Sequence, residues 1–144
     1  LEELYAGHPQ AECIGLDITD SSAVQKLVEE LIQRYGKIDV LVNNAGYGIF
    51  EEFDQITNDQ IHAMFEVNTF ALMNLSRMIG AHMKTAGKGH IVNIVSMAGL
   101  VATAKSSLYS ATKFAAIGFS NALRLELMPF WCLCNDGQSR SYPD

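Results

Sequence analysis

The stretch Ile38-Asp39-Val40-Leu41-Val42-Asn43-Asn44-Ala45-Gly46 (IDVLVNNAG) decides the fold. Residues 38–42 form a partly continuous apolar run, which is typical of a strand in a sheet that is covered on both faces. Asn43–Gly46 predicts a turn, because asparagine and glycine tolerate tight backbone conformations. A buried strand that ends in a polar turn favours a parallel sheet, in which ligands bind beyond the carboxyl ends of the strands.

Strand-like and helix-like segments alternate around this stretch. The pattern predicts, in order, a strand over 11–16 (AECIGL), a helix capped by Asp20 or Ser21 and ended by Gly36, the strand over 38–42, a helix from about Asn58 or Thr57 to about Met83, a strand over 91–95 (IVNIV), and a helix over about 108–127. This order predicts an α/β fold, a partial Rossmann-like, doubly wound parallel sheet.

Polar residues follow three of the predicted strands. Asp17, Asn43–Gly46 and Ser96 each stand where a strand ends. Because the carboxyl ends of parallel strands share one edge of the sheet, we expect these three points on one rim.

Tyr109 and Lys113 stand four residues apart at the start of the last predicted helix, so they share one helix face. Free tyrosine holds its proton until about pH 10. A nearby ammonium stabilises the phenolate, which makes tyrosine a usable general acid and base near neutral pH. Such a pair by itself is more often an ordinary surface pair. Ser96 by itself is more often a strand-end hydroxyl that caps a turn, and Asp17 by itself is as often a structural partner of the following helix. NNAG by itself is a common turn.

Composition narrows the functional classes. The formal net charge is −6 and there is no basic run, which argues against a nucleic-acid or anionic-membrane partner. No apolar run reaches the roughly 20 residues needed to span a bilayer. Three cysteines, with no disulfide-like spacing, favour a reducing cytoplasm. We expect no metal site, and no signal peptide is visible before a start at Leu1 that suggests a missing N-terminus.

In order and spacing, these residues resemble the single-domain oxidoreductase branch of the short-chain dehydrogenase/reductase family. The resemblance covers Ala11 to about Phe130. The matching positions are Asn43-Asn44-Ala45-Gly46 for the NNAG motif, Asn68 in FEVNTF, Ser96 in IVNIVS, Tyr109 and Lys113 for Tyr-x-x-x-Lys, and Asp17 with Ile18 in GLDIT.

The resemblance implies hydride transfer between NAD or NADP and a carbonyl or secondary alcohol. Tyr109 would be the general acid and base, Ser96 would polarise the substrate oxygen, and Lys113 would hold the ribose. Asn68 would bend its helix and hold a water that links Lys113 to solvent. Asn44, Ala45 and Gly46 would let the cofactor approach the backbone, and Asp17 with Ile18 would contact the adenine. The sequence leaves the choice between NAD and NADP open.

Two family features are missing from the sequence. The glycine-rich phosphate loop should lie upstream of Leu1, with the first two strands, so we expect a truncated chain that is unstable and inactive by itself. After Phe130 the family continues with a strand and a Pro-Gly loop, whereas residues 131–144 match neither. We therefore divide the chain into a catalytic domain over 1–130 and a non-native or disordered tail over 131–144. Removing one base at the Phe130–Trp131 codon junction permits the missing sequence, so a frameshift is our hypothesis; a divergent terminus is the alternative.

Partners and rival functions follow from the same residues. Residues 47–50 and 97–101 would line the substrate side, and their apolar character favours a moderately hydrophobic carbonyl or alcohol. The last helix is apolar on several sides, and the relatives use it with the helix around Asn68 as subunit interface, so we expect a homodimer or homotetramer. The alternatives are an epimerase or dehydratase of the wider family, which NNAG argues against, and an inactive fragment or pseudoenzyme.

Overall fold

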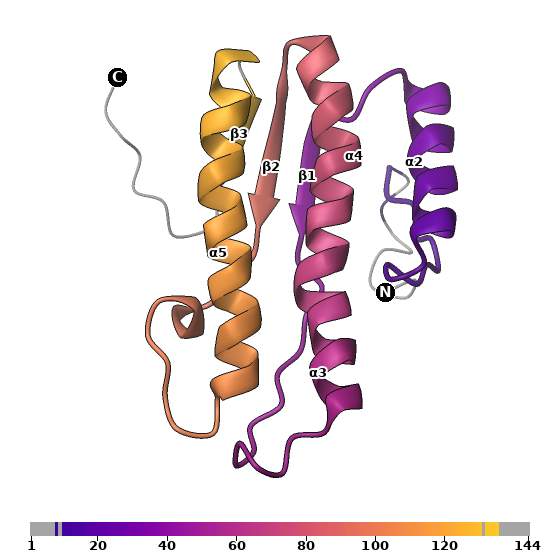
Figure 1. Ribbon diagram of the computed structural model, residues 1–144. Coiled ribbons are helices and arrows are strands. Elements are labelled where there is room, and N and C mark those ends of the chain that lie inside the picture. Colours follow the sequence, from indigo (N-terminus) through magenta and orange to yellow (C-terminus); the bar gives the residue numbers. More distant parts are fainter. Residues whose placement is uncertain (1–7, 9, 131, 136–144) are drawn as a thin grey trace.

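Three parallel strands form the sheet of the computed structural model, which describes residues 8, 10–130 and 132–135. They lie in the order β1 (Val40–Asn43), β2 (Gly89–Asn93) and β3 (Cys132–Asn135). The crossovers contain α3 (Asn58–Phe65), the π-helix η1 (Glu66–Phe70) and α4 (Ala71–Ala86), then η2 (Met97–Gly99), α5 (Ser107–Leu127) and η3 (Met128–Phe130). Figure 1 shows α4 and α5 over one face of the sheet, with the strands pointing toward the loops at the lower end. The predicted partial parallel α/β fold is confirmed.

The predicted helices are confirmed, and their caps explain where they begin and end. Helix α2 (Ser21–Tyr35) starts at Asp20, whose carboxylate accepts hydrogen bonds from the backbone N–H groups of Ser22 and Ala23. It ends at Gly36, whose φ of 77° is the left-handed conformation that glycine adopts without strain. Helix α3 begins with a capping box between Thr57 and Gln60.

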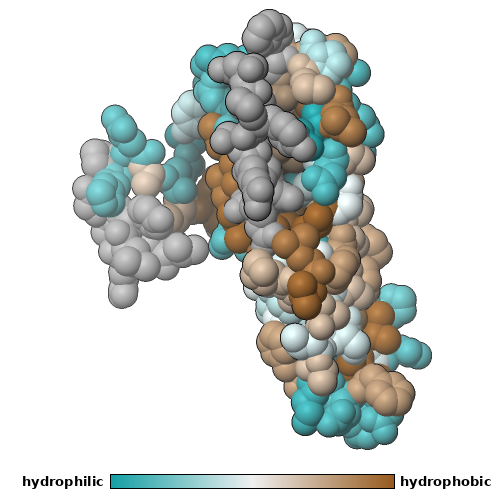
Figure 2. Space-filling model, turned by 90° about the vertical axis from the view of Figure 1, so that its left-hand side faces the viewer, coloured by the Kyte–Doolittle hydropathy of each residue, from teal (hydrophilic) through white to brown (hydrophobic). Residues whose placement is uncertain are grey.

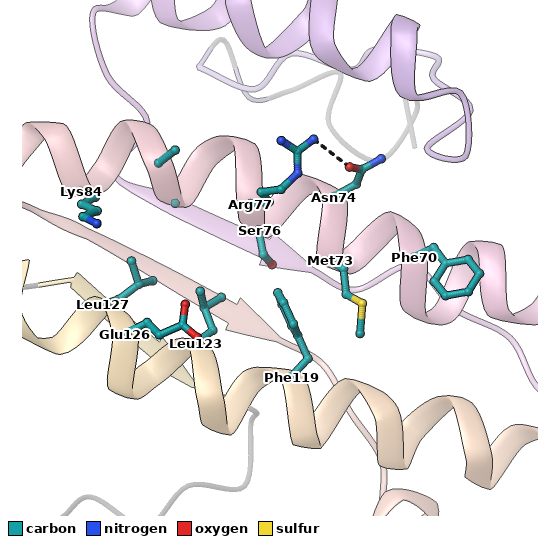
Figure 3. Close-up of a pocket in the computed structure, with 12 residues that line it drawn as sticks. Phe70, Met73, Asn74, Ser76, Arg77, Lys84, Phe119, Leu123, Glu126 and Leu127 are labelled. Carbon is teal, nitrogen blue, oxygen red and sulfur yellow. Dashed lines mark hydrogen bonds between the residues drawn. The ribbon is translucent and has the colours of Figure 1, made fainter.

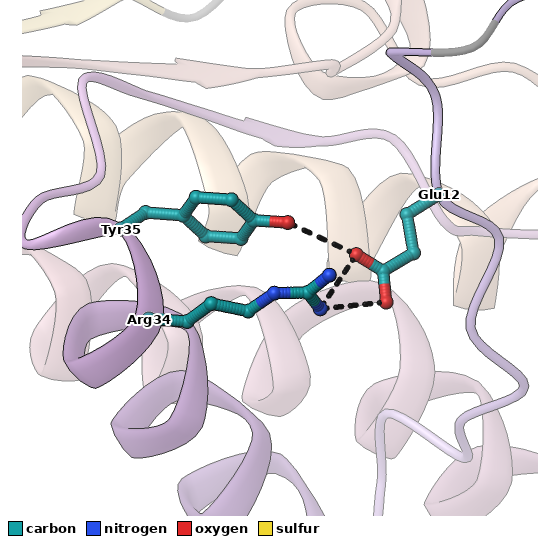
Figure 4. Close-up of polar contacts among 3 residues, drawn as sticks. All are labelled: Glu12, Arg34 and Tyr35. Carbon is teal, nitrogen blue, oxygen red and sulfur yellow. Dashed lines mark hydrogen bonds and ion pairs between the residues drawn. The ribbon is translucent and has the colours of Figure 1, made fainter.

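The strand predicted over residues 11–16 is wrong, because this segment has no regular secondary structure and pairs with no described strand. It is held by side chains instead. Nη1 of Arg34 donates to both carboxylate oxygens of Glu12 at 3.0 Å, and the Tyr35 hydroxyl donates to Glu12 at 3.2 Å (Figure 4). A strand needs a hydrogen-bonded neighbour, and the described chain supplies none at this place.

The core lies between the sheet and the helices. It joins buried side chains of α2, α4, α5, β2 and β3, namely Val24, Val28, Ile79, Met83, Ile91, Leu127, Cys132 and Cys134. The opposite face of β1 exposes Val40 and Val42, each more than half accessible. Burial of this strand on both faces, which its apolar run predicts, is therefore not seen, because no described element covers the second face.

The bounds of β1 and β2 also differ from the predictions. β1 covers Val40–Asn43 rather than 38–42, so Asn43 belongs to the strand and not to the turn. β2 begins two residues earlier than predicted and ends at Asn93 rather than at residue 95. Residues 132–135, which the sequence assigned to a tail without a strand, form β3 parallel to β2, with Cys132 and Cys134 buried. The prediction that the chain forms no strand after Phe130 is wrong at residues 132–135, because α5 returns the chain to the free edge of β2. Residues 131 and 136–144 lie outside the described residues, so the assignment of that tail stays a prediction.

Within residues 8, 10–130 and 132–135, no helix is both long enough and apolar enough to cross a membrane.

Candidate active site

Asn68 lies in a π-helical turn between α3 and α4. Within this turn the Ala71 N–H bonds to the Glu66 carbonyl, five residues earlier instead of four. The Asn68 side chain, only 1% exposed, leaves the helix to bind the loop after β1: Nδ2 donates to the Tyr47 carbonyl at 2.7 Å, and Oδ1 accepts from the Tyr47 N–H at 3.0 Å. Such π-turns recur at functional sites. The bend expected at Asn68 stays a prediction, and the structure shows a π-turn at this position.

Thr112 joins Asn68 to α5. Its hydroxyl accepts from Nδ2 of Asn68 at 3.1 Å and donates to the Tyr109 carbonyl at 2.8 Å. The Thr69 hydroxyl donates to the Thr112 carbonyl at 3.2 Å. These buried bonds fix the π-turn against the part of α5 that carries the Tyr-x-x-x-Lys motif.

Tyr109 and Lys113 share one face of α5, as their spacing predicts. Nζ of Lys113 lies 5.8 Å from the centroid of the Tyr109 ring. The Tyr109 ring is half-buried, and its hydroxyl forms no hydrogen bond with any residue that the structure describes. It is therefore available to a ligand.

Lys113 is a buried cation. Its side chain is 5% exposed, and burial lowers its pKa. Nζ donates to the Ile94 carbonyl at 3.1 Å, and no described carboxylate forms an ion pair with it. An ammonium has three donors, so two remain for other acceptors.

Gly46 lies directly over Asn68 and Lys113. A Cβ atom at Gly46 would stand 3.1 Å from Oδ1 of Asn68 and 3.5 Å from Nζ of Lys113. Asn44, Ala45 and Gly46 are themselves exposed. The NNAG loop thus offers open backbone above two buried polar groups, and any side chain at Gly46 would occupy that space.

Ser96 lies three residues after the end of β2, whereas Asp17 follows a segment that forms no strand, so the expected common rim is not seen for Asp17. Ser96 follows Ile94, the acceptor of Lys113, by two residues, and its hydroxyl accepts from the Ala98 N–H at 3.2 Å. Asp17 is exposed with Ile18 partly covered beside it. Hydrogen bonds from the Thr19 N–H and hydroxyl hold the pKa of Asp17 below its usual range. Gly46 lies close to Asn68 and Lys113, and Tyr109 lies beside Lys113 on α5, whereas Ser96 and Asp17 make their hydrogen bonds locally.

A buried amide network supports the site, and it was not predicted. Asn43 and Asn93 are register partners at the ends of β1 and β2. Nδ2 of Asn43 donates to Oδ1 of Asn93 at 2.8 Å and to the Ser76 hydroxyl at 3.0 Å, while Nδ2 of Asn93 donates to the Ser120 hydroxyl at 2.8 Å. The sequence signal that could have revealed this network is the asparagine at the end of each strand, Asn43 and Asn93. The sequence analysis assigned Asn43 only to a turn.

Comparison with known proteins now decides the family. The sequence profile described as short chain dehydrogenase matches residues 1–131. The chain belongs to this family.

Other short-chain dehydrogenases match in both sequence and structure. A 3-ketodihydrosphingosine reductase of Bacteroides thetaiotaomicron is 37% identical over 125 residues, which are 85% of this chain and 46% of that protein. A crystal structure of a short-chain dehydrogenase from Streptomyces avermitilis superposes with a TM-score of 0.88 at 37% identity, over 92% of this chain and 49% of the other. ElxO with NADP bound gives a TM-score of 0.86 at 27% identity, over 94% and 57%. The chain spans about half the length of the curated relatives it matches.

Proposed function

We propose that the full-length protein is an NAD(P)-dependent oxidoreductase that interconverts a carbonyl compound and a secondary alcohol. The observation that carries the proposal is the buried Lys113 ammonium, which lies beside Tyr109 and under the open backbone of Gly46. Its two remaining N–H donors would bind the ribose hydroxyls of the nicotinamide nucleotide. Burying a cation without an anion is costly, so a functional demand explains it better than stability does.

The loop geometry fits such a nucleotide. Asn44, Ala45 and Gly46 would line the ribose side, where the lack of a Cβ at Gly46 keeps the approach open. Asp17 and Ile18 would contact the adenine, since Asp17 is exposed and ionised through its bonds with Thr19. ElxO, a structural relative, has NADP bound, which supports the proposal that this protein binds a nicotinamide nucleotide. The proposal includes both NAD and NADP.

Two hydroxyls would handle the substrate oxygen. The Tyr109 hydroxyl would give its proton to the carbonyl oxygen during reduction and take it back from the alcohol during oxidation, with Lys113 stabilising the phenolate. The Ser96 hydroxyl accepts from Ala98, so its own hydrogen stays free to donate to the same oxygen. The bound nicotinamide would supply or accept the hydride.

Asn68 would act as a positioning residue. Both Nδ2 hydrogens are used by Tyr47 and Thr112, and one lone pair of Oδ1 is used by the Tyr47 N–H. The remaining lone pair faces the Gly46 and Lys113 region, where it would accept from the water that relays protons to Lys113.

The experiment that tests the function compares Tyr109→Phe with wild type in the full-length protein. Turnover of a panel of ketones and secondary alcohols is followed by the absorbance of NADH or NADPH. Tyr35→Phe is the matched control, because it also removes a phenol hydroxyl, from α2, outside the site. We expect Tyr109→Phe to lower kcat by about a hundredfold or more, and Tyr35→Phe to leave it unchanged.

We also propose a homodimer or homotetramer that forms through α4 and α5. A groove of about 520 Å³ lies between them. Figure 3 shows Met73 and Phe119 projecting into this groove from opposite helices. Its walls carry Arg77 and Lys84 on α4 and Glu126 on α5. Charges of both signs allow the same surface of a second copy to be complementary in a two-fold arrangement.

A reducing, cytoplasmic location belongs to the same proposal. Among the described residues, no disulfide joins Cys13, which is exposed, or the buried Cys132 and Cys134, as expected where disulfides do not persist.

A further inference from the structure

Two loops with exposed apolar side chains flank the N-terminal half of α5. Residues 44–57 follow β1 on one side, and η2 with residues 100–106 lies on the other (Figure 1). Phe50 is 62% exposed, and Met97, Leu100 and Val101 are each more than half exposed. Figure 2 views the molecule from the η2 side and shows strongly hydrophobic surface in the middle of that face.

Phe50 is held against Tyr109. The two ring centroids lie 5.4 Å apart at an interplanar angle of 57°, a favourable tilted arrangement. Gly48 permits this contact, because a Cβ there would stand 2.7 Å from the Phe50 ring and 3.3 Å from the Tyr109 ring. The loop is anchored just before, where the Tyr47 backbone bonds to Asn68. An exposed aromatic ring is thus fixed beside the tyrosine that would react.

The second loop is fixed to the same helix. A Cβ at Gly99 would lie 2.7 Å from the Lys113 carbonyl oxygen, so η2 meets α5 backbone to backbone. The Ser96 cap starts η2, and Leu100 and Val101 follow it with their side chains exposed. The apolar residues of this loop therefore stand next to the turn of α5 that carries Lys113.

Charge on the two loops opposes an anionic ligand. Lys105 is the only lysine or arginine in residues 44–57 and 97–106, and it is paired with Glu52 at 3.0 Å. Glu51 and Asp54 add further negative charge. An anionic tail would find no free cation on these loops, whereas an apolar tail would cover Phe50 and the aliphatic side chains.

We propose that Phe50 is a specificity-determining residue that selects carbonyl substrates with an uncharged, linear apolar chain. The inference rests on the proposed function for the reacting carbonyl, while the apolar contact itself requires no turnover. The chain would lie on the Phe50 ring and on Leu100 and Val101, with its carbonyl at Tyr109.

The test uses 2-butanone, 2-hexanone, 2-octanone and 2-decanone with the full-length protein. Their affinity is measured by ligand-observed NMR, and kcat/KM is measured with NADH or NADPH. Phe50→Ala is compared with Phe50→Leu and with Phe53→Ala, a second phenylalanine of the same loop that is 80% exposed. Circular dichroism confirms that each variant is folded.

We expect wild-type affinity and kcat/KM to rise about two- to fourfold for each added methylene. Phe50→Ala should make this rise less steep and lower the value for 2-decanone about tenfold, Phe50→Leu should restore part of it, and Phe53→Ala should match wild type. Affinity that does not depend on chain length, no binding of any ketone, or equal losses in Phe50→Ala and Phe53→Ala would overturn the inference. Binding that depends on chain length, without turnover, would support the role of Phe50 and contradict the proposed function. Turnover that does not depend on chain length would support the proposed function and contradict the role of Phe50.

Discussion

Lys113 combines deep burial with a charge that no described carboxylate neutralises. Its place beside Tyr109 follows from spacing on a helix, which the sequence shows directly. Its bond to the Ile94 carbonyl joins residues that are 19 positions apart and depends on how α5 packs on the sheet, so no local pattern reveals it. The same holds for Thr112, whose hydroxyl links Asn68 to Tyr109. Roles within one helix were predictable; contacts between elements were not.

Burial of Lys113 makes stability depend on pH. Its folded-state pKa is lowered from 10.5, so between the lowered value and about pH 10.5 the unfolded chain binds more protons than the folded one. The free energy of unfolding therefore rises with pH through that window. Below the window, the folded protein bears the full cost of burying the charged ammonium. Lys113→Met removes the charge, and we expect the full-length variant to equal wild type or exceed it by up to about 2 kcal/mol at pH 7, without the alkaline rise.

Urea denaturation at a series of pH values from neutral to alkaline measures this difference. Lys26→Met, an exposed lysine of α2, is the control and should follow wild type. A Lys113→Met curve parallel to wild type across the window would contradict the assignment of a buried ammonium.

Helices and strands differed in how well their own residues predicted them. α2 carries its own caps, Asp20 and Gly36, and α5 is a long apolar segment, so the extents of both helices agree with expectation. The segment over 11–16 and β3 show the opposite case, because strand formation depends on a neighbour: the first has none among the described strands, and the second gains β2. The π-turn at Asn68 differs from an α-turn only in hydrogen-bond register, which composition does not encode.

The contact between η2 and α5 gives an element-scale prediction. Gly99→Ala would place Cβ 2.7 Å from backbone atoms of Lys113, so we expect it to lower the free energy of unfolding by about 1–3 kcal/mol. Gly118→Ala, in the exposed middle of α5 with no neighbour within 4 Å, should raise it by about 0.5–1 kcal/mol. Chemical denaturation of the two full-length variants provides the comparison. Equal effects of the two substitutions would show that η2 does not approach α5 this closely.

At the scale of the whole molecule, the groove between α4 and α5 is the surface that we propose for a second copy. The groove between α4 and α5 is apolar at its centre, and Phe119 lies on its α5 wall (Figure 3). Phe119→Glu should convert the proposed oligomer of the full-length protein to smaller species, because a carboxylate would be buried at the contact without a partner. Leu125→Glu, on an exposed position of α5 outside the groove, should leave the mass unchanged. Light scattering distinguishes them, and a wild-type monomer or equal behaviour of both variants would refute the interface.

The central claim is that Tyr109, set beside Lys113, moves the proton of a nicotinamide-dependent reaction. The most direct measurement is the ratio of kcat between wild type and Tyr109→Phe in the full-length protein, with binding of the reduced cofactor followed by its fluorescence in both. The account predicts a fall of about a hundredfold or more with cofactor affinity nearly unchanged. A Tyr109→Phe variant that retains kcat within about threefold of wild type would contradict it.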